Sequence, residues 1–106
     1  MRYVDGFVLP IAARNLAAYR RIAQKAGKIW REHGALAYLE CAGDDLAIKG
    51  VASFPKSIKA RPRETVVFAW IVFKSRAHRD RVNALVMKDP RTAAMMDPSQ
   101  KIVDPK

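Results

Sequence analysis

The first apolar pattern along the chain is a short alternation over Tyr3–Leu9. Successive side chains of a strand point to opposite faces of a sheet, so this alternation is typical of a β-strand. One face would carry Tyr3, Asp5, Phe7 and Leu9, and the other Val4, Gly6 and Val8. Proline has no N–H to give to a ladder, so we expect Pro10 to end this strand.

The spacing of apolar residues changes to steps of three and four from about Ala13, which predicts a long amphipathic helix. Its apolar stripe consists of Leu16, Tyr19, Ile22, Ala23, Ala26, Ile29, Trp30 and His33. Gly34 follows directly, where glycine commonly ends a helix. His33, in the last turn, could simply complement the negative end of the helix dipole.

The rest of the chain alternates between strand and helix signals. Leu36–Cys41 and the β-branched, aromatic Glu64–Phe73 predict two more strands, and Ile48–Phe54 a short extension of the sheet. Ser75 is a typical N-cap for a second helix, which the residue before Pro90 should end. A short helical turn is expected over 91–96.

The predicted order is therefore β-α-β-β-α, which favours an α+β fold with two helices on one face of an antiparallel sheet. A ferredoxin-like plait has this order and adds a final strand beside the first. We expect residues 1–106 to form a single domain of this kind that lacks the final strand.

The third predicted strand is apolar on both faces. One face presents Thr65, Val67, Ala69, Ile71 and Phe73, and the other Val66, Phe68, Trp70 and Val72. Two helices cover only one face of a small sheet, and soluble monomers rarely leave a broad apolar surface exposed. We therefore predict a homodimer in which the two uncovered sheet faces meet. The alternative is that the segment Ala42–Arg63 folds over this face within one chain.

Charge is the unusual feature of the composition. Twenty Lys and Arg against ten Asp and Glu give a net charge of +10, which favours anionic partners. One basic group lies along the first helix (Arg14, Arg20, Arg21, Lys25, Lys28 and Arg31), and a second surrounds two prolines (Lys56, Lys59, Arg61 and Arg63). Binding of nucleic acid or of an acidic ligand is one interpretation, and a solvated helix face with a basic loop is the other. An RNA-recognition platform is disfavoured because the third strand lacks a basic-Gly-aromatic motif.

The remaining composition indicates a cytoplasmic protein. There is one cysteine, Cys41, which rules out an intrachain disulfide and is expected to be buried. The longest apolar run, Val66–Phe73, is far shorter than the ~20 residues that span a bilayer, and no secretory signal is visible. We expect no membrane association and, with only two histidines and no ligand spacing, no metal site.

No established catalytic signature occurs, but ionisable and aromatic groups project from the predicted strands. Asp5, Tyr38, Glu40 and Trp70 form this set. A charged group among apolar sheet residues is costly unless it is paired or used, so one of the carboxylates could act as a general base. The alternative is that Asp5 and Glu40 pair with Arg or Lys, and that Trp70 is a core residue.

Several short segments, in this order, resemble the YbaA-like family of small bacterial proteins of unknown function. They are Tyr3-Val-Asp-Gly-Phe-Val, Glu32-His-Gly-Ala-Leu, Glu40-Cys, Gly43-Asp-Asp, Glu64-Thr-Val-Val-Phe-Ala-Trp and Met87-Lys-Asp-Pro-Arg. This chain departs from the family pattern at Ala42, where an aromatic residue is usual, and in lacking a final glycine-aromatic strand. The family is similar to the dimeric α/β-barrel superfamily, which includes antibiotic-biosynthesis-type monooxygenases.

The resemblance implies a homodimer that binds a small organic ligand between sheet and helices, with monooxygenase-like chemistry that needs no cofactor. Trp70 and His33 would then shape the pocket, and Asp5, Glu40 or His33 would take part in catalysis. The candidate ligand-binding residues are Tyr38, Trp70, Phe7 and Phe68. A non-catalytic interaction module, or RNA binding through the basic surface, is the alternative function.

Overall fold

The centre of the fold is a three-stranded antiparallel sheet. A computed structural model describes residues 1–43 and 53–95. Strands β1 (Tyr3–Ala12), β2 (Ala37–Ala42) and β3 (Glu64–Phe73) lie in the order β1-β3-β2. Both outer strands run antiparallel to β3, so β1 and β2 are parallel and need a crossover connection.

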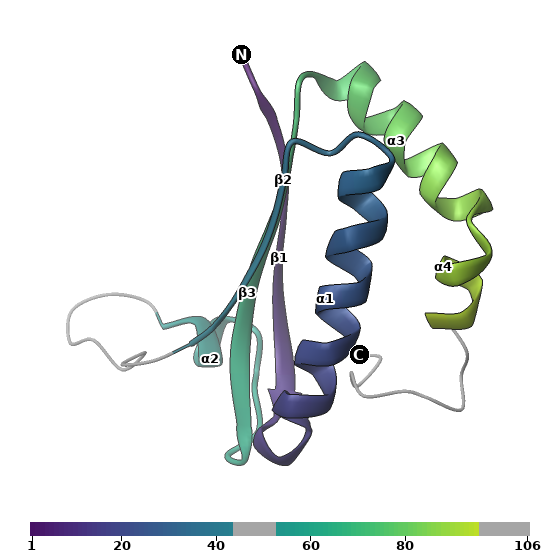
Figure 1. Cartoon of the computed structure of the whole chain (residues 1–106). Helices are drawn as coiled ribbons and strands as arrows, with labels where there is room; N and C mark the ends of the chain where they lie inside the picture. The colour runs from purple at the N-terminus through teal and green to yellow at the C-terminus, as the bar shows by residue number, and fades with distance from the viewer. Residues whose placement is uncertain (44–52, 96–106) are drawn as a thin grey trace.

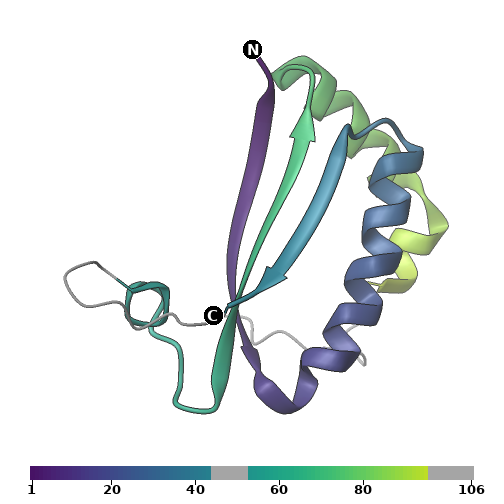
Figure 2. The ribbon, with the colours of Figure 1, turned by 60° about the vertical axis from the view of Figure 1, so that its left-hand side comes forward.

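Helix α1 (Leu16–Glu32) supplies this crossover, after a 3₁₀ turn at Ala13–Asn15. The chain continues after β3 into α3 (Arg76–Lys88) and α4 (Pro90–Met95). Figures 1 and 2 show α1, α3 and α4 on the same side of the sheet. The predicted α+β class, with helices on one face of an antiparallel sheet, is confirmed.

The helix ends follow the signals in the sequence. Gly34 has a φ of 117°, a left-handed conformation that glycine adopts without strain, so it ends α1 as predicted. The Ser75 hydroxyl accepts a hydrogen bond from the His78 backbone N–H (3.1 Å), which caps α3. Asp89 is extended before Pro90 and ends that helix.

One expectation about strand boundaries is wrong, and another falls mostly outside the described residues. Pro10 does not end β1, which continues to Ala12 with Pro10 opposite Val66. In the described sheet β1 has β3 as its neighbour on one side alone, and such an edge strand tolerates a proline whose missing N–H faces outward. Of the expected extension over 48–54, residues 48–52 lie outside the described residues, and Phe54 begins the short helix α2 (Phe54–Ser57).

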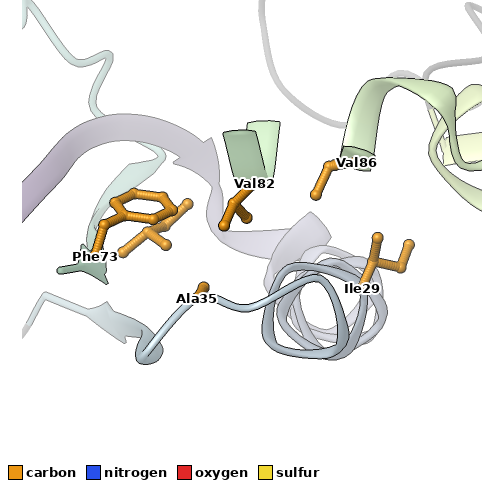
Figure 3. Packing of buried hydrophobic residues seen from close by; sticks show 6 residues of the cluster. Ile29, Ala35, Phe73, Val82 and Val86 are labelled. Carbon is orange, nitrogen blue, oxygen red and sulfur yellow. The ribbon is translucent and has the colours of Figure 1, made fainter. Parts of the chain in front are cut away.

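The core lies between the sheet and the helices. Phe73, Val82 and Val86 are fully or almost fully buried, and Ile29 of α1 is 2% exposed. Figure 3 shows Val86 and Ile29 facing each other, with Phe73 and Ala35 beyond Val82. This cluster joins the C-terminal half of α1 to α3 and to the end of β3.

The opposite face of the sheet, which we call the open face, remains largely exposed. Cross-strand register places Val4, Gly6 and Val8 of β1, Phe68, Trp70 and Val72 of β3, and Ala37, Leu39 and Cys41 of β2 on it. Val4 is 53% exposed and Leu39 45%. Val66, at the end where α2 contacts β3, is buried. In the described part of the chain, cover on this face is therefore confined to one end.

The position of the core predicts that two truncations of apolar side chains on the helices lower the free energy of unfolding by different amounts. Ile29→Ala removes a buried side chain and should lower the free energy of unfolding by about 2–5 kcal/mol. Leu85→Ala, at a position 49% exposed on α3, should lower it by less than about 0.5 kcal/mol. Urea unfolding followed by circular dichroism measures both values, and equal losses would place the core elsewhere.

Candidate functional site

A pocket of about 470 Å³ lies between α1 and β2, the strand that Figure 2 shows beside this helix. We call it the α1–β2 pocket. Its polar lining comes from Tyr19, Arg20, Gln24, Arg31, Tyr38 and Glu40, and its apolar lining from Leu16, Ala23, Ala42 and Val67. The pocket exists because α1 leaves the edge of the sheet only partly covered, and because Tyr38, Glu40 and Ala42 alternate along β2 toward the helix.

Glu40 lies at the centre of the polar lining and is held by two tyrosines. The Tyr19 hydroxyl, from α1, donates a hydrogen bond to Glu40 Oε1. The Tyr38 hydroxyl, from the same strand as Glu40, donates to Oε2 at 3.3 Å. Each carboxylate oxygen therefore has its own hydroxyl donor, which satisfies a charged group that the sheet partly buries.

The two tyrosines are kept in their neutral, hydrogen-donating form. Burial is the largest effect raising the pKa of Tyr19 above its usual value, and the hydrogen bond to the Glu40 carboxylate raises it further. Burial also raises the pKa of Tyr38, together with the negative charge of Glu40. A neutral phenol beside a carboxylate gives the pocket fixed donors and a fixed acceptor at physiological pH.

Gly27 makes room for Tyr38 against α1. A Cβ atom at Gly27 would lie 2.9 Å from Cδ1 of Tyr38 and 3.1 Å from Nη1 of Arg31. The Tyr38 ring also contacts Trp30, with ring centroids 6.0 Å apart. The glycine costs helix stability, but it lets the tyrosine ring lie directly on the helix backbone with its hydroxyl at Glu40.

Asp5 does not line this pocket and has a structural partner instead. Arg79 Nη1 of α3 lies 2.9 Å from Asp5 Oδ1 and 3.2 Å from Oδ2. The same guanidinium lies 4.9 Å above the Tyr3 ring. The alternative that Asp5 and Glu40 pair with Arg or Lys therefore holds for Asp5, which pairs with Arg79. Glu40 instead accepts hydrogen bonds from two tyrosines.

His33 also lies outside the pocket, in an ionic network at the end of α1. Its Nε2 is 2.8 Å from Asp89 Oδ2, and Arg91 Nη2 lies 2.8 Å from the same oxygen. Arg91 reaches back to Glu32 at 2.7 Å, so the network joins the end of α1 to the junction of α3 and α4. The hydrogen bonds from Arg91 are the largest cause of the lowered pKa of Asp89, followed by that with His33.

The aromatic candidates are divided between two faces. Trp70 and Phe68 lie on the open face, with ring centroids 5.4 Å apart, on the side of the sheet opposite Glu40. Phe7 shares the face of Glu40 but belongs to β1, on the far side of β3, and is 43% exposed. Of the seven candidate site residues, Tyr38 and Glu40 are the pair that lines the α1–β2 pocket.

Sequence reasoning does not assign several residues to this site. Tyr19 belongs to the predicted apolar stripe, Arg20 and Arg31 belong to the predicted basic group, and Gly27 carries no prediction. The available signal was Gly27 itself, because a glycine inside an otherwise strong helix indicates close packing. A buried tyrosine hydroxyl also needs a partner, which in this chain is Glu40.

Three further features concern metal ligands, membrane-spanning helices and the Cys41 thiol. Residues 1–43 and 53–95 contain no group of three His, Cys, Asp or Glu side chains arranged to hold a metal ion. Among their helices, none has the length and apolar character needed to cross a membrane. Cys41, expected to be buried, is exposed because it lies opposite Phe68 on the open face.

Comparison with known proteins identifies the family. Residues 2–102 match DUF1428, a family of proteins of unknown function. This chain belongs to the DUF1428 family. It is 43% identical over 91 residues to the uncharacterized protein YbaA of Escherichia coli strain K12, covering 86% of this chain and 78% of YbaA. The YbaA protein of Shigella flexneri gives the same values. The expected resemblance to YbaA-like proteins is thus confirmed for nearly the whole DUF1428 chain.

Gly27 provides the first test of the site. Helix propensity alone predicts that Gly27→Ala stabilises the protein by about 1 kcal/mol. The clash with Tyr38 should instead make this variant less stable than the wild type and move the Tyr38 ring resonances. Ala84→Gly, at an exposed interior position of α3, measures the propensity effect alone and should cost about 1 kcal/mol. A stabilised Gly27→Ala protein with unmoved Tyr38 resonances would contradict this packing.

The network at Asp89 predicts a pH-dependent stability. Its pKa is lower in the folded chain than the usual ~3.9, so the unfolded chain binds more protons and stability falls as the pH falls. The contribution of Asp89 should be complete above about pH 5 and decline below it. Asp89→Asn should therefore be less stable than the wild type near neutral pH, with a difference that shrinks below about pH 4.

Thermal unfolding of both proteins across this pH range measures the effect. Asparagine can still cap α4 through its side-chain oxygen, so the helix start is preserved in the variant. Asp80→Asn, which removes an exposed carboxylate, is the control. A difference between wild type and Asp89→Asn that stays constant with pH would contradict the assigned role of this carboxylate.

Proposed function

We propose that this DUF1428 protein binds a small organic molecule in the α1–β2 pocket. The observation that carries the proposal is Glu40, whose two oxygens each accept a hydrogen bond from the hydroxyl of a half-buried tyrosine. Such a preorganised polar centre, next to apolar lining from Leu16, Ala23 and Val67, is typical of ligand sites. The volume of about 470 Å³ suits a small molecule.

We further propose that the functional unit is a homodimer formed through the open face. The exposed Val4 and Leu39 support it, since fully burying such side chains contributes roughly 1.5–3 kcal/mol each. The strand order β1-β3-β2, with α1 crossing between parallel strands, is compatible with a ferredoxin-like plait. Two such sheets meeting by their open faces would form the dimeric α/β barrel that the family resemblance implies.

The resemblance also implies a reaction, the oxidation of a quinol-like ligand by oxygen with no cofactor. Glu40 is the carboxylate of the pocket and could accept a proton from a ligand hydroxyl, with Tyr19 and Tyr38 stabilising its charge in the ligand-free state. Asp5 and His33 have ionic partners away from the pocket, so we assign them no part in this step.

The basic surface supports a second candidate function, non-specific binding of nucleic acid. All six basic residues of the Arg14–Arg31 segment are exposed, and they lie on one helical segment. Such binding would depend on phosphate contacts and would weaken steeply with salt. Binding of a random oligonucleotide that is lost between about 50 and 200 mM salt would support it.

The ligand proposal is tested with two tryptophan variants on α1. Ala23→Trp should fill the pocket, whereas Ala17→Trp adds the same ring at an exposed position away from it. With a set of small aromatic molecules as probes, amide and side-chain resonances of Tyr19, Tyr38 and Glu40 should shift in the wild type and in Ala17→Trp. These shifts should disappear in Ala23→Trp. Probe shifts that persist in Ala23→Trp, or that lie elsewhere, would overturn the proposal.

The dimer proposal is tested with two charged substitutions at similarly exposed leucines. Sedimentation equilibrium of the wild type should give about twice the 11.9 kDa mass of one chain. Leu39→Glu places a charge on the open face and should give a folded monomer, while Leu85→Glu on α3 should remain dimeric. A wild-type mass of one chain, or dissociation by Leu85→Glu alone, would refute this interface.

A further inference from the structure

We infer that the ligand of the α1–β2 pocket is an organic anion with an elongated apolar body, whose negative group is bound by Arg31. This inference rests on the proposed ligand-binding function and adds the chemical class of the ligand. It depends on where Arg31 lies, on the partners that Arg31 lacks, and on the way the lining changes along the pocket.

Arg31 is exposed on α1, and its guanidinium lies beside the polar end of the pocket. Its Nη1 is 3.1 Å from the position that a Cβ atom of Gly27 would occupy, one turn back along α1. The Tyr38 ring lies against that same position, at 2.9 Å. Long helical side chains lean toward the N-terminus of their helix, which explains this placement. The guanidinium is thus beside the ring whose hydroxyl holds Glu40.

Within residues 1–43 and 53–95, no carboxylate pairs with Arg31. Among the described residues, Arg31 forms no ion pair, in contrast to Arg79 and Arg91, which each contact two carboxylates. Glu40 lines the same pocket, but its oxygens accept from Tyr19 and Tyr38. The guanidinium therefore keeps its planar set of N–H donors, the geometry that binds carboxylates in a bidentate manner.

The surrounding charge favours an anion as well. Among the described residues of the lining, Arg20 and Arg31 outnumber the single carboxylate, Glu40, so this part of the lining carries a net positive charge. The neighbouring Lys25 and Lys28 of α1 are exposed and add potential of the same sign. A pocket in such a field concentrates anions and disfavours cations.

The lining changes from polar to apolar along α1. Arg31 and Tyr38 form one end, and Tyr19, Ala23 and Glu40 the middle. Leu16, at the first turn of α1, forms the other end together with Ala42 and Val67, which are opposite each other in the sheet. The helical rise from Leu16 to Gly27 is ~16 Å, so the pocket suits a ligand that is long rather than compact. Its acid group would bind at Arg31 and its apolar body would extend toward Leu16.

Three probes with one body and different charge test the inference: 4-phenylbutyrate, 4-phenylbutanol and 4-phenylbutylamine. The butyrate should bind the wild type about tenfold more tightly than the alcohol, and the amine most weakly, as measured by chemical-shift titration at low ionic strength. Arg31→Gln should reduce the preference for the butyrate over the alcohol to about twofold. Lys28→Gln removes the same charge from an exposed position of α1 outside the pocket. This variant should keep most of the preference for the butyrate over the alcohol.

The outcomes separate this inference from the proposed function. If the alcohol or amine shifts the pocket resonances as strongly as the butyrate, the pocket binds ligands but the anionic class is wrong. If Arg31→Gln and Lys28→Gln weaken butyrate binding equally, the general field and not Arg31 selects the charge, which also overturns the inference. If none of the three probes shifts the pocket resonances, the pocket is not a ligand site, and the proposed function fails with the inference.

Discussion

The fold depends on one constraint, which is that β3 is apolar on both of its faces. Its helix side provides Ile71 and Phe73 to the core, where the hydrophobic effect holds α1 and α3 against the sheet. The same strand places Phe68 and Trp70 on the other side, where the described residues bury only the end next to α2. A sheet of this kind gains most by meeting a second apolar layer, which in the proposed homodimer would come from a second copy of the chain.

The candidate site lies on the face of the sheet that the helices cover. Because β1 and β2 are parallel with β3 between them, α1 must cross the sheet to reach β2. It packs closely where Gly27 meets Tyr38, and less closely toward Leu16, which leaves the pocket between them. The side chains of the pocket are therefore positioned by the main crossover of the fold. The ion pair of Asp5 with Arg79 and the hydrogen bond between His33 and Asp89 serve a different purpose and fasten α3 and α4 to the sheet and to α1.

Much of the fold could be predicted because its signals are local. The bounds of β3, the end of α1 at Gly34 and the cap at Ser75 depend on short-range patterns of apolar, glycine and serine residues. Pro10 misled the prediction because whether a proline ends a strand depends on which edge of the sheet it occupies, and strand order is not a local property.

The site was predictable only in part, for the same reason. In a strand over Leu36–Cys41, Tyr38 and Glu40 share one face because they are two residues apart, but this spacing could not show that Tyr19 of α1 would meet Glu40. The partners of Asp5 and His33 are 74 and 56 residues away in the sequence, so no local pattern reveals them. Trp70 was expected beside Glu40, but the two lie on opposite faces, as the period of two along the paired strands requires.

The central claim is that a second copy covers the open face, and the thiol of Cys41 reports on that face directly. Cys41 is exposed within one chain and lies opposite Phe68 in the sheet. Its rate of reaction with a disulfide reagent should be at least about tenfold lower in the wild type than in Leu39→Glu, because thiol exchange requires access to the sulfur. The wild-type rate should also rise on dilution as the dimer dissociates. A wild-type thiol that reacts as fast as that of Leu39→Glu at every protein concentration would contradict the account.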